Sequence, residues 1–119
     1  MTAMTASEHG AVLTIDLGAL ADNWRLLGSL ARTKSAASET GAVVKAAAYG
    51  LGTEAVVSAL AKAGCRTFFV AHLSEARRAR SAAPEATIYV LNGLPRGASK
   101  AMLVPSSRTA VTVTLRRAA

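Results

Sequence analysis

The sequence predicts an α/β fold in which short apolar strands alternate with helices. Three runs of four or five mostly apolar residues recur along the chain, and helical patterns follow the first two. Strands that read as continuous apolar runs, separated by helices, favour a parallel sheet covered by helices. The intervals from Val44 to Val70 and from Val70 to Val90 suit one βα unit of an eight-stranded barrel or of a doubly wound sheet. Periodicity alone does not choose between these two architectures.

The first elements after the N-terminus are a short strand and a helix. Residues 1–10 are expected to be a disordered lead-in, and Ala11–Ile15 is expected to be a short strand. Asp16 follows, and its carboxylate can cap a helix by accepting from the free N–H groups of the first turn. Apolar residues then recur at steps of three and four, which places them on one helical face: Leu17, Leu20, Trp24, Leu27 and Leu30. The Ser/Thr-rich segment 33–41 is expected to be a loop.

The second unit consists of a strand, a glycine-containing turn and a helix. Ala42–Ala46 is the predicted strand, and Tyr49–Gly52 is the predicted turn. Thr53 can cap a helix that runs to about Ala63, where Gly64 suits a C-terminal stop. The unit is therefore expected to deliver Lys45 to the end of a buried strand.

Two further strands follow at similar spacing. Thr67–Ala71 is a predicted strand, and its helix begins near Ser74 and ends at Pro84. Ile88–Leu91 is the third apolar strand. Beyond it the pattern weakens, because residues 111–115 alternate like an exposed strand and no helix completes a fourth unit.

Composition and charge exclude several classes of protein. No apolar run reaches about 20 residues, so no membrane span is expected, and the N-terminus lacks a secretory leader pattern. Cys65 has no partner for an internal disulfide, which suits the cytoplasm. The net charge of +7 lies in the second half, but no aromatic residues are interleaved with the basic ones. Nucleic acid is therefore not an expected partner, and we interpret Arg77, Arg78 and Arg80 as a solvated helix face.

Lys45 is the residue on which the chemistry depends. A lysine at the end of an apolar strand is often a side chain that reaches into solvent. Alternatively it is a nucleophilic amine at the end of the sheet where barrel enzymes place their sites. The second interpretation is favoured by Tyr49, Gly50 and Gly52. The hydroxyl of Tyr49 could bind an anion, and the two glycines let the backbone come close to that anion just before the N-terminus of the next helix. His9 and His72 have no partners at metal-ligand spacing, so no metal site is expected.

The order and spacing of four segments resemble the alanine racemase family. The longest string, Val43–Gly52, resembles the family's cofactor-lysine motif, in which valines precede Lys-Ala-Asn-Ala-Tyr-Gly and a further Gly. Thr14–Asn23, Phe68–Ala76 and Ile88–Gly93 are similar to the opening helix and the next two strands. The resemblance covers residues 11–103, which would be part of the family's N-terminal barrel, and residues 104–119 would be an atypical basic tail.

This resemblance implies a partial (β/α)8 barrel of about three parallel βα units that binds pyridoxal 5'-phosphate. Lys45 matches the catalytic lysine that holds the cofactor covalently and moves the α-proton on one face of the substrate. Tyr49 matches the tyrosine that contacts the cofactor phosphate, and Val43 and Leu91 match positions that line the cofactor pocket. The implied activity interconverts L- and D-alanine and supplies D-alanine for peptidoglycan, in a cytoplasmic homodimer.

The sequence also departs from the family pattern. Ala47 stands where the family has Asn or Asp, and Tyr49 and Tyr89 do not match the second catalytic tyrosine, which the partner subunit supplies. The alternative hypothesis is therefore a cofactor-binding barrel fragment without activity, or an inactive remnant. A truncation or frame change after about Leu103 would explain the tail, and coding DNA that continues in the family frame would refute that explanation.

Overall fold

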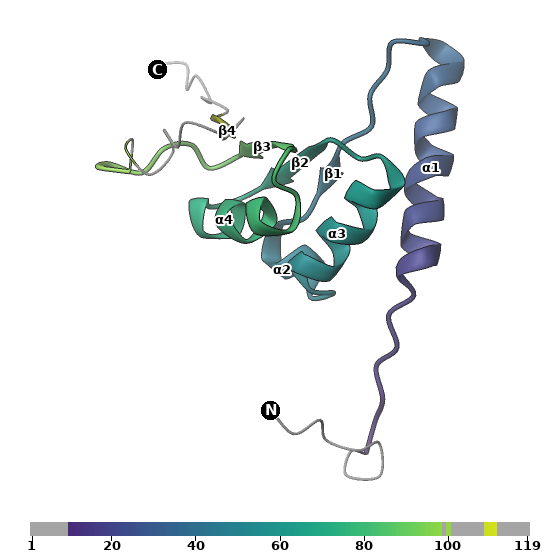
Figure 1. Ribbon diagram of the computed structural model, residues 1–119, viewed down its shortest axis with the longest axis horizontal. Coiled ribbons are helices and arrows are strands. Elements are labelled where there is room, and N and C mark those ends of the chain that lie inside the picture. The colour runs from purple at the N-terminus through teal and green to yellow at the C-terminus, as the bar shows by residue number, and fades with distance from the viewer. Residues whose placement is uncertain (1–9, 99, 101–108, 112–119) are drawn as a thin grey trace, which may run out of the picture.

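The computed structural model describes residues 10–98, 100 and 109–111, which contain both helices and strands (Figure 1). The elements in chain order are α1 Leu17–Lys34, β1 Ala42–Val43, α2 Lys45–Tyr49, α3 Thr53–Ala63, β2 Thr67–Val70, α4 Leu73–Ala82, β3 Thr87–Val90 and β4 Thr109–Val111. The predicted α/β class is confirmed. None of the helices in the described part of the chain is long and apolar enough to span a membrane.

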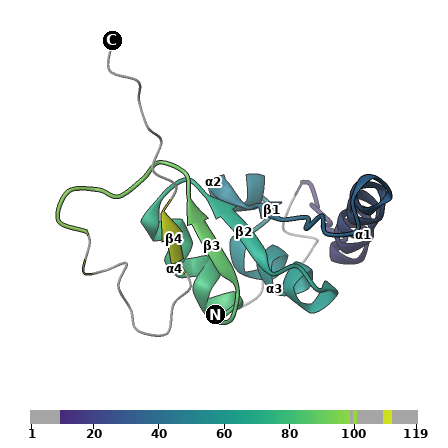
Figure 2. The ribbon, with the colours of Figure 1, turned by 90° about the horizontal axis from the view of Figure 1, so that it is seen from above.

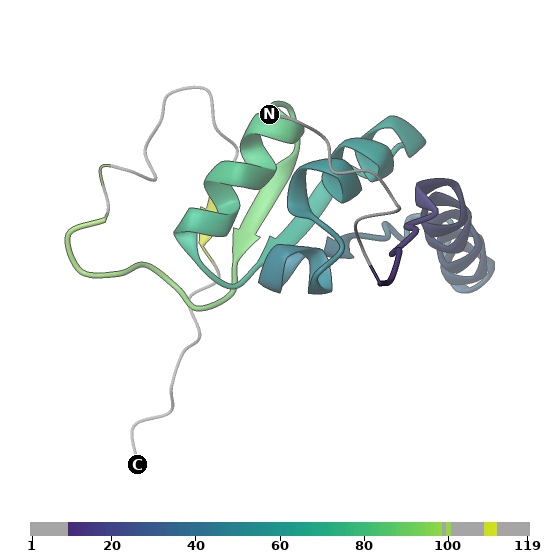
Figure 3. The ribbon, with the colours of Figure 1, turned by 90° about the horizontal axis from the view of Figure 1, so that it is seen from below.

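The strands form one parallel sheet in the order β1-β2-β3-β4 (Figure 2). The register aligns Val43 with Phe69 and Phe69 with Tyr89. α3 and α4 lie side by side across one face of the sheet, and α1 lies on the β1 side (Figure 3). All parallel strands therefore end at one edge of the sheet, where β1 delivers Lys45.

One face of the sheet carries the core. Burial alternates along β2 and β3, so that every second side chain is buried beneath the helices. The largest fully buried side chains come from this face, from the end of β1 and from the facing side of α3: Phe68, Ile88, Val44, Val57, Val70 and Val90. On the other face, the rings of Phe69 and Tyr89 stack with centroids 5.1 Å apart. That second face has no helix over it within the described residues.

Only half of the apolar face of α1 packs against the rest of the protein. Asp16 is the N-cap as predicted, since its Oδ1 accepts from Ala19 N–H at 2.9 Å. Trp24 packs against the core, and its Nε1–H donates to Thr40 O at 3.0 Å. Leu27 and Leu30 remain 60% and 55% exposed. The helix also continues to Lys34, so the predicted loop begins later than expected.

Three sequence predictions about local structure are wrong. Residues 11–15 are described and form no strand, because they lead away from the sheet and meet no neighbouring strand with which to pair (Figure 1). The β1 strand ends at Val43 rather than Ala46, because the chain turns into α2. The N-cap of α3 is Gly52 rather than Thr53, whose hydroxyl is buried without a hydrogen-bond partner.

The terminal segments lie mostly outside the described residues. The disordered lead-in predicted for residues 1–10 falls there except for Gly10. Of the predicted tail, 104–119, only residues 109–111 are described, and they form β4 beside β3. The helix boundaries predicted at Ala63 and Gly64 are confirmed, with Gly64 in the left-handed conformation.

Candidate functional site

The candidate site lies where the parallel strands end. Lys45 follows β1 and is the first residue of α2, while His72 and Asn92 follow β2 and β3. Enzymes built on parallel α/β sheets place their reactive groups at this carboxyl edge. Lys45 is exposed, and it follows the buried Val44 directly after the end of β1. The amine is therefore carried at the open edge of the sheet.

The backbone after Lys45 makes a left-handed turn. Ala46, Ala47, Ala48 and Tyr49 have φ angles of 52°, 53°, 54° and 55°. The left-handed conformation costs an L-residue about 1–2 kcal/mol, and non-glycine residues adopt it singly rather than in runs. Four in succession, directly after the candidate nucleophile, form a strained segment of the kind that clusters at functional sites.

Hydrogen bonds and glycines hold this turn in place. The N–H groups of Ala48 and Gly50 donate to Val44 O and Ala46 O at 3.1 and 3.0 Å. Gly50 and Gly52 continue with φ angles of 85° and 100°, and no atom lies within 4 Å of a Cβ placed at either. The glycines therefore permit a further change of direction before α3 and leave open space beside the backbone.

The residues predicted to form the site are all accessible but do not all share one cavity. Tyr49, Val43 and Leu91 are 63%, 45% and 36% exposed. Val43 and Tyr49 line a mainly apolar cavity of about 300 Å³ between α1, β1, α2 and α3, together with Trp24. Lys45 and Leu91 do not line it. The structure thus brings Val43 and Tyr49 together at the β1 edge and places Leu91 at the end of β3.

Sequence reasoning missed Glu75 at this site. Its Oε1 accepts from the N–H groups of Ala71 and His72 at 3.0 and 2.8 Å. Its Oε2 accepts from Ala46 N–H, next to Lys45, at 2.5 Å. The available signal was only a glutamate in the first turn of a predicted helix, which indicates capping and gives no hint of a contact 29 residues away.

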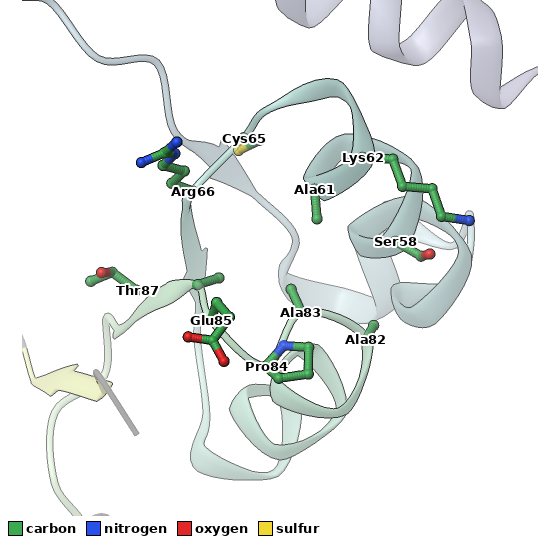
Figure 4. A pocket seen from close by; sticks show the side chains of 11 residues that line it. Ser58, Ala61, Lys62, Cys65, Arg66, Ala82, Ala83, Pro84, Glu85 and Thr87 are labelled. Atoms are coloured by element: carbon green, nitrogen blue, oxygen red, sulfur yellow. The ribbon is translucent and has the colours of Figure 1, made fainter. Parts of the chain in front are cut away.

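A second, larger cavity lies at the opposite end of the sheet (Figure 4). It has a volume of about 610 Å³, and its lining comes from the ends of α3 and α4 and the residues that enter β2 and β3. Lys62 and Glu85 are among the charged residues that line it. Cys65 also lines it, and burial raises the pKa of its thiol. Cys65 is 3% exposed.

His72 and Asn92 are neighbours at the carboxyl edge. His72 Nδ1 and Asn92 Nδ2 are 3.4 Å apart, and both side chains are exposed. This pair lies at the ends of adjacent strands β2 and β3. His72 thus faces solvent at this edge of the sheet.

Comparisons with known proteins agree on one family. The family model described as alanine racemase, N-terminal domain, matches residues 15–117. An alanine racemase of Methylobacterium sp. strain 4-46 is 62% identical over 99 residues, which are 82% of this chain and 26% of that protein. The catabolic alanine racemase of Agrobacterium fabrum is 55% identical over 93 residues, 77% of this chain and 22% of that protein.

A solved structure extends the match to three dimensions. The crystal structure of alanine racemase from Bartonella henselae with covalently bound pyridoxal phosphate superposes with a TM-score of 0.68 at 43% identity. The match covers 74% of this chain and 25% of that one. The chain therefore spans about a quarter of the length of the curated relatives that it matches.

Proposed function

Because this chain belongs to the alanine racemase N-terminal domain family, we propose that it is the cofactor-anchoring part of a pyridoxal phosphate-dependent amino-acid racemase. The observation that carries the proposal is the placement of Lys45. It is exposed at the carboxyl edge of a parallel sheet and is followed at once by the left-handed turn that carries Tyr49. The barrel relative that this sheet resembles holds pyridoxal phosphate covalently.

The residues of the site suit this cofactor. Lys45 would hold the cofactor through its Nζ, because an exposed amine can reach and bond to an aldehyde carbon. The exposed hydroxyl of Tyr49 is free to donate to a phosphate oxygen. Val43 and Leu91 are accessible apolar side chains that would contact the ring of the cofactor. Pyridoxal phosphate, when bound, supplies the electron sink for a carbanion at the substrate α-carbon.

Lys45 also has the role of a proton carrier in this proposal. Its amine takes the α-proton on one face of the substrate, or returns it on that face. The proposed substrate is alanine, and the product D-alanine would enter peptidoglycan. The complete protein is proposed to act in the cytoplasm as a homodimer.

A second candidate function is cofactor binding without racemisation. The chain covers only 26% of the length of its Methylobacterium relative. A proton donor or acceptor on the opposite face of the substrate is not among the residues that we assign to the site. A fragment that anchors the cofactor and lacks that second group would hold the substrate without inverting it.

The test is covalent capture of pyridoxal phosphate. The 119-residue chain is mixed with pyridoxal phosphate, the visible absorbance is recorded, and borohydride then reduces the new bond. Peptide mass spectrometry should locate the modification on Lys45. Lys45→Ala should remove the absorbance and the modified peptide, whereas the matched variant Lys62→Ala, an exposed lysine at the other end of the sheet, should retain both.

The outcomes separate the two candidates. Conversion of L-alanine to D-alanine by the loaded chain supports the racemase, and capture on Lys45 without conversion supports the non-racemising fragment. Modification spread equally over Lys45 and Lys62 would contradict both, because it would show ordinary surface reactivity.

A further inference from the structure

The carboxylate of Glu75 joins the segment that carries Lys45 to the start of α4. Glu75 lies in the first turn of α4 and is partly buried. One oxygen accepts from Ala71 N–H and His72 N–H, at 3.0 and 2.8 Å, and the other accepts from Ala46 N–H at 2.5 Å. Hydrogen bonds to an ionised acceptor are about twice as strong as neutral ones. A single side chain thus ties two segments that are 29 residues apart in sequence.

The position of this carboxylate is explained by the end of the β1–β2 ladder. Val44 N–H donates to Phe69 O at 2.8 Å, which is the last ladder bond in this direction. A parallel ladder that continued at even spacing would send Ala71 N–H to Val44 O and Ala46 N–H to Ala71 O. Instead, both of these N–H groups donate to Glu75.

The carbonyls that would have received those bonds accept from other N–H groups instead. Val44 O accepts from Ala48 N–H inside the left-handed turn, at 3.1 Å. Ala71 O accepts from Asn92 N–H, at 3.1 Å. Without Glu75, the N–H of Ala46 would lose the partner that holds the first residue of the strained turn. The carboxylate therefore accepts the hydrogen bonds that the β1–β2 ladder would have received if β1 had continued in the sheet.

We propose that Glu75 is a positioning residue, whose carboxylate fixes the backbone at Ala46 and so holds the left-handed turn between Lys45 and Tyr49 in a single geometry. This inference rests on the proposed function, because Lys45 and Tyr49 are assigned there to the cofactor. Glu75 acts through the backbone and needs no contact with substrate or cofactor.

A capping role alone is the competing explanation, and Glu75→Gln separates the two. The glutamine carbonyl oxygen can still accept from Ala71 and His72, as Oε1 does now. Its amide nitrogen takes the place of Oε2 and cannot accept from Ala46 N–H. The substitution therefore keeps the cap of α4 and removes the link to the turn.

The experiment measures amide hydrogen exchange by NMR and pyridoxal phosphate binding on the full 119-residue chain. In Glu75→Gln we expect exchange at Ala46 to accelerate about tenfold, while Ala71 and His72 keep their protection. The apparent Kd for pyridoxal phosphate, followed by its visible absorbance, should rise about tenfold. Glu85→Gln, the same change at an exposed position at the far end of the sheet, should alter neither quantity.

The results separate the positioning role of Glu75 from the proposed function. Unchanged exchange at Ala46 in Glu75→Gln would overturn the positioning role, whether or not cofactor binds. Faster exchange at Ala46 with an unchanged Kd would also overturn it, since the link would then be structural only. Failure of the wild-type chain to take up pyridoxal phosphate would refute the proposed function, and the exchange rates would still show whether Glu75 holds the turn.

Discussion

The left-handed turn after Lys45 leads us to predict a change in stability of unusual sign. Replacing Ala46 with glycine should stabilise the protein, although glycine is normally destabilising in helical segments. Ala46 is exposed, so its methyl group contributes little packing, and its φ is 52°. The left-handed conformation costs alanine about 1–2 kcal/mol, and glycine adds about 0.4–1 kcal/mol of unfolded-state entropy. At the midpoints of these two ranges the difference is a gain of about 0.8 kcal/mol in the free energy of unfolding.

The assay is urea unfolding followed by circular dichroism, with a thermal scan beside it. A gain of that size should raise Tm by about 2–5 °C for a chain of this length. The matched control is Ala55→Gly, at an exposed position of the right-handed helix α3, which should lower stability by about 0.5–1 kcal/mol. If both substitutions destabilise equally, the turn is not left-handed in solution and the strain argument for this site fails.

Three further predictions concern the core, the surface and the buried thiol. Ile88 has no exposed surface, so Ile88→Val should lower the free energy of unfolding, measured in urea, by about 0.5–1.5 kcal/mol. Val12 is 70% exposed, so Val12→Ala should change it by less than about 0.5 kcal/mol. The hydrogen bonds from Arg78, at 2.7 and 2.8 Å, lower the pKa of Glu54 from 4.5. The stability that this pair contributes is therefore present above the pKa of Glu54 in the unfolded chain and is lost as the pH falls through its pKa in the folded protein. In Glu54→Gln, Tm should therefore fall less steeply with decreasing pH in the acidic range. An unchanged pH dependence of Tm would contradict the pairing. Burial raises the pKa of the Cys65 thiol, so iodoacetamide should label it slowly at pH 8 in the native protein and rapidly in urea, and equal rates would show that Cys65 is not buried.

Much of the site could be located from the sequence, but its geometry could not. The motif around Lys45 placed a lysine and a tyrosine at the carboxyl end of a predicted strand, and both are exposed there. A string of alanines predicts a strand or a right-handed helix, so the reversal of handedness from Ala46 to Tyr49 was not foreseen. The hydrogen bond from Ala46 N–H to the carboxylate of Glu75 joins two units of the fold, and no local pattern encodes it.

The fold class and the identity of the core strands follow from the sequence alone. Apolar runs at β2 and β3 and the glycine at position 64 are local signals, because a strand that packs against the core and a left-handed helix end each demand particular residue types. The tertiary structure decided where β1 ends, that residues 11–15 remain unpaired, and that half of the apolar face of α1 stays exposed. The reason is that a strand or an apolar helix face needs a neighbour, and the sequence of one segment does not state whether that neighbour is within reach.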